Sequence, residues 1–297
     1  MADRRTVLVT GASSGIGRAL AGEFLARGWH VVATLRHAGT RGDLFADLPA
    51  AHVRRLTVLS LDVTDAGERG AVGKAVAAWP RGLDCLVNNA GYALFGALED
   101  VSESQLRRQM EVNFFGAALL TRECLPALRQ ARGCVINVSS VLGFRGLPLN
   151  AAYCASKFAL EGLSEALRHE LRPHGVQVTL VEPGRHRTRF GEHAVWGEGS
   201  GRPDSPYARQ SAAYRGLVAR LARRGAAGPA RVARTVVRLA SMRRLPLRVR
   251  VGPDSRGLHL LGRLLPERVA WRVWAMACDR LFRTSAREPS GVLVRQD

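Results

Sequence analysis

Short apolar runs recur along most of this chain, separated by longer stretches in which apolar residues recur with a helical period. Runs of five or six mostly apolar residues are typical of strands that are buried on both faces of a parallel sheet. Six such runs are Thr6–Thr10, His30–Leu35, Leu56–Leu61, Leu83–Val87, Cys134–Val138 and Val176–Val181. Helical stretches lie between them, including Arg18–Arg27 and the run from Asn150 to about Leu171. The alternation predicts an α/β fold with a parallel sheet flanked by helices.

The pattern changes in the last third of the chain. Gly191 to Arg215 is rich in glycine, proline, serine and charge. A helix is expected after Gly228-Pro229, and Leu247–Val251 alternates as an edge strand with one wet face does. Farther on, Leu258–Leu265 and Val269–Met276 are basic and amphipathic. Three interpretations of this tail remain open: a cover over a substrate pocket, a partner surface, or binding to a membrane surface.

A glycine-rich loop, Gly11-Ala-Ser-Ser-Gly15-Ile-Gly17, joins the first strand to the first helix. Glycines there let the backbone turn tightly and approach a pyrophosphate, and the helix start offers N–H groups to it. The loop therefore predicts a dinucleotide site. Arg36 follows the second strand, where an acidic residue would bind a ribose hydroxyl and repel a 2′-phosphate. We expect Arg36, assisted by Arg18, to bind the 2′-phosphate, so that NADP(H) is preferred over NAD(H). The alternative is that Arg36 is one more of the many solvated arginines of this chain.

Polar residues follow the later strands. Asp62, at the end of the third, either accepts from an adenine amino group or caps the next helix. The loop Asn88-Asn-Ala-Gly91 after the fourth has small residues that let the backbone approach a flat ligand. Ser102 to Gln105 looks like a capping box, and the helix that it opens carries Asn113 in its interior. An asparagine there must either bond backbone or hold a water that leads to Lys157.

Tyr153 and Lys157 lie four residues apart on one face of a predicted helix. A cation ~4 Å from a phenolate at an effective dielectric of ~20 stabilises it by about 4 kcal/mol. Even half of that lowers a phenol pKa of about 10 by more than one unit, toward the range of a general acid or base. The alternative is a packed tyrosine and a solvated lysine. However, Lys74 and Lys157 are the only lysines of this arginine-rich chain, which indicates a need for a compact ammonium.

Ser140 stands at the carboxyl end of the fifth strand, where ligands bind in open α/β sheets. It precedes Tyr153 by thirteen residues, and its hydroxyl can donate to a substrate oxygen while Tyr153 transfers the proton. Pro183-Gly184 follow the sixth strand in the same way.

Composition and charge limit the classes of protein to which this chain can belong. The 297 residues are 46% hydrophobic, and no run has the ~18 apolar residues of a membrane span. The net charge is +19, but the arginines are spread along the chain without interleaved aromatic residues, so we do not expect nucleic-acid binding. Five scattered cysteines without a Cys-x-x-Cys motif indicate reduced thiols. No signal peptide is recognised at Met1, and we expect a cytoplasmic protein without a metal.

Taken together, these motifs resemble the short-chain dehydrogenase/reductases of the single-domain branch. The resemblance rests on Thr10-Gly-x-x-x-Gly-x-Gly17, Asp62, Asn88-Asn-Ala-Gly91, Asn113, Ser140, Tyr153-x-x-x-Lys157 and Pro183-Gly184-x-x-x-Thr188, in that order. It runs from about Thr6 to Gly252. The stretches Val32–Arg36 and Tyr153–Leu163 look most like the hydroxysteroid and retinol dehydrogenases, for which such a strand end goes with NADP(H).

The resemblance implies a Rossmann-type doubly wound sheet and an oxidoreductase that interconverts an alcohol with a ketone or aldehyde on a fairly apolar substrate. Tyr153 would be the proton donor or acceptor, Ser140 would polarise the carbonyl, Lys157 would lower the tyrosine pKa, and Asn113 would continue a proton relay. Cofactor contacts are then expected from Gly11, Ser13, Ser14, Gly15, Ile16, Gly17, Arg36, Asp62, Val63, Asn89, Ala90, Gly91, Tyr153, Lys157, Pro183, Gly184 and Thr188.

The resemblance also implies an assembly and a domain plan. A homodimer or homotetramer is expected, with the Asn113 and Tyr153 helices of two subunits packed together. Residues 1–252 would form the catalytic domain, with a mobile substrate lid at about 190–215 that includes Phe190, Trp196, Tyr207 and Tyr214. Residues 253–297 would be a helical extension packed on it, ranked first as a cover over the pocket; peripheral membrane contact is not favoured.

One departure from the family concerns Arg185-His-Arg187 and Arg189, where small or apolar residues are usual. These side chains either face solvent or make the entrance of the site basic, as in a reductase of acidic substrates. A sugar-nucleotide epimerase is disfavoured by the glycine loop and by the short C-terminal region. A non-catalytic nucleotide-sensing or scaffold protein is disfavoured as well, because it has no need of Ser140, Tyr153, Lys157 and Asn113 together.

Overall fold

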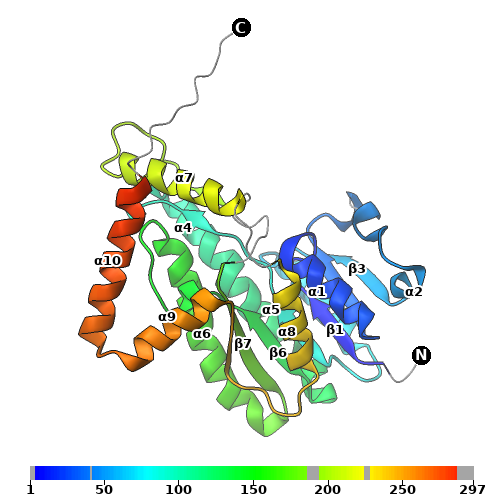
Figure 1. The fold of residues 1–297 in the computed structure, drawn as a ribbon. Coiled ribbons are helices and arrows are strands. Elements are labelled where there is room, and N and C mark those ends of the chain that lie inside the picture. Colours follow the sequence, from blue (N-terminus) through cyan, green and yellow to red (C-terminus); the bar gives the residue numbers. More distant parts are fainter. Residues whose placement is uncertain (1–3, 41, 186–193, 224–227, 286–297) are drawn as a thin grey trace.

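A parallel sheet of seven strands forms the centre of the computed structural model, which describes residues 4–40, 42–185, 194–223 and 228–285 (Figure 1). The strand order is β3-β2-β1-β4-β6-β7-β9. Their bounds are β1 Thr6–Val9, β2 His30–Leu35, β3 Leu56–Ser60, β4 Cys85–Asn88, β6 Cys134–Val138, β7 Gln177–Pro183 and β9 Arg248–Val251. Every neighbouring pair runs parallel, so the carboxyl ends of all strands lie along one edge. The predicted α/β class, strand positions and Rossmann-type order are confirmed.

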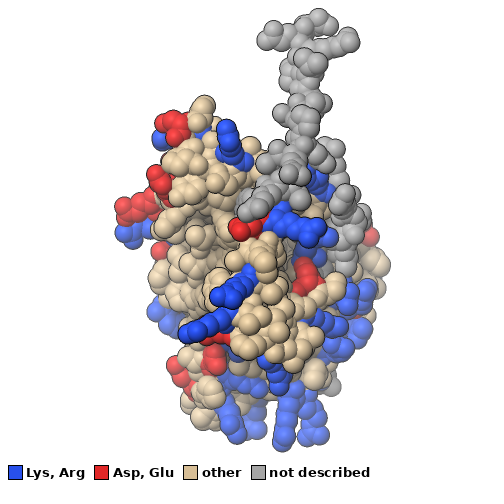
Figure 2. Space-filling view, turned by 60° about the vertical axis from the view of Figure 1, so that its left-hand side comes forward, with Lys and Arg blue, Asp and Glu red and all other residues tan. Residues whose placement is uncertain are grey.

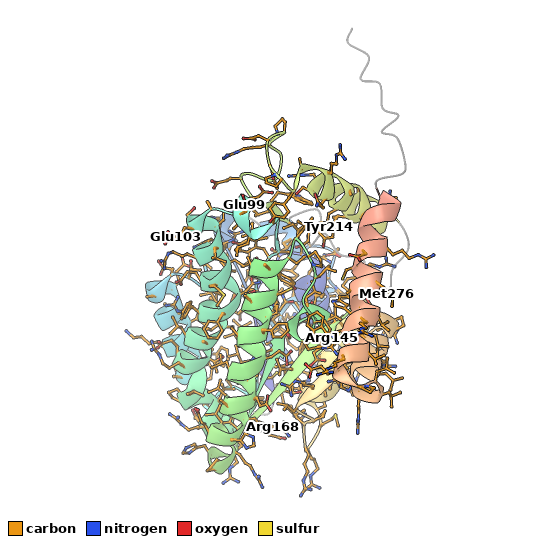
Figure 3. The ribbon with its side chains drawn as sticks, turned by 90° about the vertical axis from the view of Figure 1, so that its left-hand side faces the viewer. Glu99, Glu103, Arg145, Arg168, Tyr214 and Met276 are labelled. Atoms are coloured by element: carbon orange, nitrogen blue, oxygen red, sulfur yellow. The ribbon has the colours of Figure 1, made fainter. Side chains whose placement is uncertain are left out.

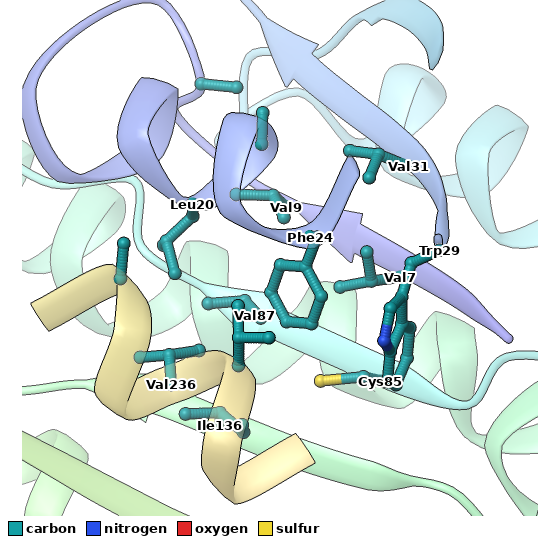
Figure 4. Close-up of a cluster of buried hydrophobic side chains, with 14 of the residues drawn as sticks. Val7, Val9, Leu20, Phe24, Trp29, Val31, Cys85, Val87, Ile136 and Val236 are labelled. Carbon is teal, nitrogen blue, oxygen red and sulfur yellow. The ribbon is translucent and has the colours of Figure 1, made fainter. Parts of the chain in front are cut away.

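Helices cover both faces of this sheet. The helices of the sheet region are α1 Gly15–Ala26, α2 Ala50–Val53, α3 Ala66–Ala77, α4 Glu103–Met110, α5 Gly116–Ala131, α6 Ala151–Leu171 and α8 Ala230–Ala240. Helices α1 and α8 pack on one face, where Phe24 and Val236 lie over Val7, Val9 and Ile136 (Figure 4). Helices α3 and α5 pack on the other, where Leu120 and Val76 meet Leu8 and Leu86. Successive side chains of β1 therefore point into the cores on opposite faces of the sheet, which is why the strand is apolar throughout.

A series of buried hydrogen bonds joins α6 to the middle of the sheet. Asn88 of β4 donates through Nδ2 to Oδ1 of Asn137 on β6 over 2.8 Å, and the two residues are paired in register. Asn137 in turn donates to the Ser164 hydroxyl of α6 over 2.7 Å. Because buried amides are costly unless they are hydrogen-bonded, this series of bonds specifies where α6 lies on the sheet.

The remaining elements gather at one side of the sheet (Figure 1). They are a small parallel pair, β5 Leu94–Phe95 and β8 Val195–Trp196, and the helices α7 Ala208–Arg223, α9 Pro253–Leu264 and α10 Glu267–Ser285. Helix α10 packs against α7, and Trp274 donates its indole N–H to the Gly146 carbonyl over 2.8 Å. The predicted C-terminal helices are confirmed, whereas the division into domains stays a prediction. Within the described ranges, no helix has the length and apolar content needed to cross a bilayer.

Candidate active site

The glycine loop is packed against the loop after β4, and both lie at the carboxyl edge of the sheet. The Thr10 hydroxyl accepts from the backbone N–H groups of Asn89 and Ala90, each over 2.9 Å. The Asn89 amide donates back to the Thr10 carbonyl over 2.8 Å. A Cβ on Gly17 would lie 2.1 Å from the Gly11 oxygen, so only glycine fits there. These contacts hold the predicted pyrophosphate loop, including Ser13 and Ile16, beside Ala90 and Gly91.

Helix α1 begins at Gly15 with its first N–H groups directed toward this edge. Its N-cap residue, Ser14, makes no side-chain capping bond to these amides. The first N–H groups of a helix have no partner within it, and they bind anions readily. The loop therefore fits the phosphates of a dinucleotide, although the individual contacts stay predictions.

The two arginines expected at the 2′-phosphate differ in their surroundings. Arg36 is exposed directly after β2 and, among the described residues, forms no hydrogen bond or ion pair. Arg18 pairs with Asp47 and donates through Nε to the Leu44 carbonyl over 3.2 Å. Arg36 is thus available to an incoming phosphate, whereas Arg18 would have to leave Asp47 first.

Asp62 binds its own loop rather than capping the next helix. Its Oδ1 accepts from the Thr64 N–H over 2.9 Å and from the Thr64 hydroxyl over 2.7 Å, and Arg108 lies 3.3 Å from Oδ2. Partial burial opposes ionisation, but the Thr64 hydrogen bonds and the Arg108 charge outweigh it and hold the pKa of Asp62 below its ordinary value. Helix α3 is instead capped by Asp65, which accepts from Glu68 N–H over 2.7 Å. Val63 is buried beside Asp62.

Ser140 and Tyr153 meet at the end of β6. Ser140 caps a short 3-10 turn, Val141–Gly143, by accepting from the Leu142 N–H over 3.1 Å. Tyr153, in the first turn of α6, is buried, and burial raises the pKa of its phenol, opposed by a hydrogen bond with Ser140. The net direction is upward, opposite to the lowering expected from the Lys157 charge. In this state Tyr153 keeps its proton at neutral pH.

Lys157 lies one turn farther along α6 and is also buried. Its Nζ donates to the Val138 carbonyl over 2.9 Å and lies 5.9 Å from the centre of the Tyr153 ring. Burial lowers the lysine pKa to about 8, opposed by the charge of Glu161. The ammonium is therefore bound by the strand end, and the alternative of a solvated lysine is wrong.

Asn113 lies in a π-helical turn, Glu111–Phe115, between α4 and α5, which the sequence pattern did not predict. Its Oδ1 accepts from the Tyr92 N–H over 3.1 Å, and its Nδ2 donates to the Tyr92 carbonyl over 3.0 Å and to the Ser156 hydroxyl over 3.1 Å. A Cβ on Gly91 would lie 3.0 Å from Oδ1 of Asn113 and 3.8 Å from Nζ of Lys157. The asparagine thus bonds backbone, with only a glycine between it and the lysine.

Pro183 and Gly184 end β7 at the same edge, where a side chain of the C-terminal extension holds them. Gly184 donates its N–H to the Val251 carbonyl over 2.8 Å, and Arg185 N–H donates to the Asp254 carboxylate. A Cβ on Gly184 would lie 1.9 Å from Oδ1 of Asp254. Arg185 is exposed. Thr188, Arg187, Arg189 and Phe190 lie outside the described residues, so the basic entrance stays an open interpretation.

An apolar wall lies beside Tyr153. The cluster joins Tyr153 to Phe95, Leu149 and Tyr214, with Trp196 and Tyr207 packed against it. Tyr214 hydrogen-bonds the buried Asn150 amide, with its hydroxyl 3.0 Å from Nδ2. In the view of Figure 3, Tyr214 lies between α6 and α10. A groove of about 950 Å³ opens on the outer side of this wall, lined by residues that include Leu98, Leu149, Tyr207, Ala213 and, from α10, Asp279.

Comparison with known proteins agrees with this geometry. A family model described as short chain dehydrogenase matches residues 5–196, well over half of the chain. The chain belongs to the short-chain dehydrogenase family. Family membership accounts for the joint occurrence of the glycine loop, the Asn88–Gly91 loop and the Tyr153–Lys157 pair.

Three relatives illustrate the range of this family. The uncharacterized oxidoreductase YusZ of Bacillus subtilis is 43% identical over 189 residues, which are 63% of this chain and 66% of the relative. The 3-ketodihydrosphingosine reductase of Bacteroides thetaiotaomicron is 34% identical over 249 residues, 83% of this chain and 87% of that one. Human retinol dehydrogenase 8 is 40% identical over 190 residues, 63% of this chain and 60% of that one. The match thus spans slightly less than two thirds of YusZ and of the human relative.

Solved structures of short-chain dehydrogenases have the same fold. One from Streptomyces avermitilis gives a TM-score of 0.76 at 37% identity and covers 95% of this chain and 98% of its own. One from Burkholderia cenocepacia, in complex with NADP, gives 0.70 at 25% identity, with 92% and 98% covered. A third, from Burkholderia phymatum and in complex with NAD, gives 0.74 at 24% identity, with 88% and 94% covered. Structural neighbours of this short-chain dehydrogenase therefore bind both nicotinamide dinucleotides.

Sequence reasoning missed several residues of this short-chain dehydrogenase site. Asp254 belongs to the C-terminal extension, yet it contacts the Gly184–Arg185 turn. Asn150 immediately precedes α6, where the pattern indicates only the start of a helix, and it binds Tyr214. Glu161 escapes notice too, although its four-residue spacing from Lys157 is the same signal as that between Tyr153 and Lys157.

Proposed function

We propose that this protein is an NADP(H)-dependent oxidoreductase that interconverts an alcohol with a ketone or aldehyde on a fairly apolar substrate. The observation that carries the proposal is the convergence of Ser140, Tyr153 and Lys157 at the end of β6, beside a loop built for a dinucleotide. A non-catalytic scaffold on this fold has no use for a buried lysine at that position. Because burying an ammonium costs free energy, its presence favours catalysis.

The chain's own residues supply the proton and orient the carbonyl. A bound nicotinamide dinucleotide supplies the hydride. The Tyr153 hydroxyl donates a proton to the substrate oxygen, the Ser140 hydroxyl bonds the same oxygen, and the Lys157 ammonium stabilises the tyrosinate that remains. Asn113 fixes the Tyr92 backbone beside Gly91 and so shapes the wall behind the lysine. Because burial raises the pKa of Tyr153, the phenol carries its proton at neutral pH, and donating it requires the Lys157 charge to stabilise the tyrosinate.

The substrate class follows from the wall on the other side of Tyr153. Phe95, Leu149 and Tyr214 present apolar surface there. Cations lie at its edge, because Arg215 stacks on Trp196 with Cζ 3.9 Å from the ring centre and Arg209 lines the groove. The names of two relatives, a 3-ketodihydrosphingosine reductase and a retinol dehydrogenase, point to long apolar substrates for those proteins. We infer a bulky apolar ketone or aldehyde for this chain. An acidic substrate is less well supported, because Arg185 is exposed and bound through its backbone.

The decisive experiment removes one hydroxyl. Tyr153→Phe is expected to lower the rate of NADPH-dependent ketone reduction at least a hundredfold, because general acid catalysis contributes about 10²–10⁴-fold. The dissociation constant for NADPH, measured by fluorescence titration, is expected to stay within about threefold of the wild-type value. Retention of a tenth of the rate would contradict the assignment of Tyr153, and a wild-type protein that binds NADPH but reduces no carbonyl compound would favour the scaffold alternative.

A further inference from the structure

Helix α6 carries five ionisable residues at intervals of four: Tyr153, Lys157, Glu161, Glu165 and His169. Residues four apart on a helix lie one above the other, so Glu161 is the next side chain beyond Lys157 on the same face. Both are buried, with 5% of Lys157 and 6% of Glu161 exposed. A carboxylate is thus placed one helical turn from the candidate catalytic ammonium, on the side away from Tyr153.

The contacts of Glu161 connect it to the turn that carries Ser140. Its Oε2 accepts from Nε of Arg248 over 2.8 Å, and its Oε1 is buried without a hydrogen bond to any described residue. A Cβ on Gly143 would lie 3.2 Å from this Oε1 and 2.6 Å from the Ser139 hydroxyl. Glu161 therefore packs beneath the turn that carries Ser140, and one of its oxygens is not engaged by Arg248.

Charged side chains of α6, β7 and β9 lie around Glu161. Arg248 of β9 also binds Glu165 of α6 over 3.0 Å and approaches Glu182 of β7 to 3.5 Å, and Arg250 of β9 lies 3.0 Å from Glu182. Burial and the nearby Glu161 charge raise the pKa of Glu182 to about 7, with both arginines opposing. These groups line a cavity of about 500 Å³ together with Arg145, His259 and Arg263.

We propose that Glu161 is a positioning residue that keeps Lys157 in its ammonium form for the reduction; this rests on the proposed function. Among the described residues, no carboxylate contacts Lys157, and the Val138 carbonyl alone accepts from its ammonium. Burial therefore works against its charge, and Glu161 is the group that opposes burial. Two unit charges separated by roughly 7 Å at an effective dielectric of about 20 shift a pKa by up to about 1.7 units, so a shift of one unit or more is expected.

The test is a pH profile of ketone reduction. In the wild type, kcat/KM is expected to fall above about pH 8, where Lys157 loses its charge. Glu161→Gln is expected to move this alkaline limb about one pH unit lower, and Glu161→Asp to restore it. Glu165→Gln is the matched control, because Glu165 binds the same Arg248 but is 54% exposed and lies two turns from Lys157. The proposal is overturned if the alkaline limb of the profile does not move in Glu161→Gln, or if Glu165→Gln moves it equally.

A second measurement does not depend on turnover. Lys157 and Lys74 are the only lysines, and Lys74 is exposed on α3, so competitive acetylation compares a buried lysine with an internal reference in one digest. The midpoint for Lys157 relative to Lys74 is expected to fall by about one unit in Glu161→Gln; no change overturns the proposal. A shift without any carbonyl reduction would contradict the proposed function but keep the role of Glu161. Should the single variant fail to fold, Arg248→Met tests the proposal in the opposite direction. It removes the cation paired with Glu161 and is expected to raise the midpoint for Lys157, so a lowered midpoint would overturn the proposal.

Discussion

At the residue scale, the proposed cofactor preference depends on two arginines. Arg36 and Arg18 both lie near the expected ribose, but only Arg36 is without a partner among the described residues, while Arg18 is paired with Asp47. Charge-assisted hydrogen bonds contribute about 1.5–3 kcal/mol each. The proposed preference for NADPH is therefore expected to rest mainly on Arg36.

Replacement of Arg36 by leucine tests this at the residue scale. The ratio of the dissociation constants for NADH and NADPH is expected to shrink about ten- to a hundredfold, because the bidentate contact to the 2′-phosphate is lost. Fluorescence titration of both cofactors measures it. Arg27→Leu is the control, because Arg27 lies at the other end of α1, paired with Glu23. An unchanged ratio in Arg36→Leu would mean that the 2′-phosphate is bound elsewhere.

The C-terminal helices are the element that the sequence left most open. Asp254 at the start of α9 holds the Gly184–Arg185 turn, whereas α10 contacts α7 and contributes Asp279 to the apolar groove. The two helices thus differ in role. Helix α9 is joined to the end of β7, and α10 lines the groove through Asp279, while the cover interpretation stays a prediction.

Deletion of residues 266–297 separates these roles, because it keeps α9 and Asp254. The Michaelis constant is expected to rise severalfold for bulky apolar ketones and to change less for small ones, while NADPH binding is spared. Steady-state kinetics with bulky, small and acidic ketones measures this. Trp274→Phe, which removes the N–H bonded to Gly146 and replaces the indole by a smaller ring, is expected to show a weaker effect in the same direction. If the truncated protein treats all ketones as the full chain does, or if only acidic ketones turn over, the apolar pocket covered by α10 is refuted.

At the scale of the whole molecule, the charge of +19 is distributed rather than concentrated. Figure 2 shows basic side chains scattered over one face, with acidic and uncharged residues among them. A distributed charge favours solubility more than recognition of a polyanion. The exposed aromatic residues are more informative, because Phe115, 41% exposed, precedes α5 and Phe158, 47% exposed, lies on α6. The family resemblance predicts that this helical face is the dimer interface.

A charge placed on that face tests the assembly. Phe158→Glu is expected to convert a dimer into a monomer, because it sets two carboxylates against each other across a twofold contact. Sedimentation velocity at micromolar concentration measures the mass. Met242→Glu, a change of the same kind at a position 45% exposed and beyond α8, is expected to leave the dimer intact. A wild-type monomer, or a dimeric Phe158→Glu variant, would contradict this interface.

The sequence by itself determined the parts of this protein that depend on local pattern. Strands β2 and β6 begin and end at the predicted residues, because a strand buried on both faces must be apolar throughout. The capping box at Ser102 and Gln105 formed as predicted, since both partners lie within one turn. The Tyr153 and Lys157 pair was recognisable for the same reason, as a helix places residues four apart together.

Only the tertiary structure decided the contacts that join distant segments. Asp62 is paired with Arg108, Arg18 with Asp47, and Glu161 with Arg248, each across a separation that no local period encodes. The direction of the Tyr153 pKa shift also depends on the fold, because burial is a property of everything packed around the phenol. The neighbours of a side chain follow from which strands and helices meet, and the strand order β3-β2-β1-β4-β6-β7-β9 sets those meetings.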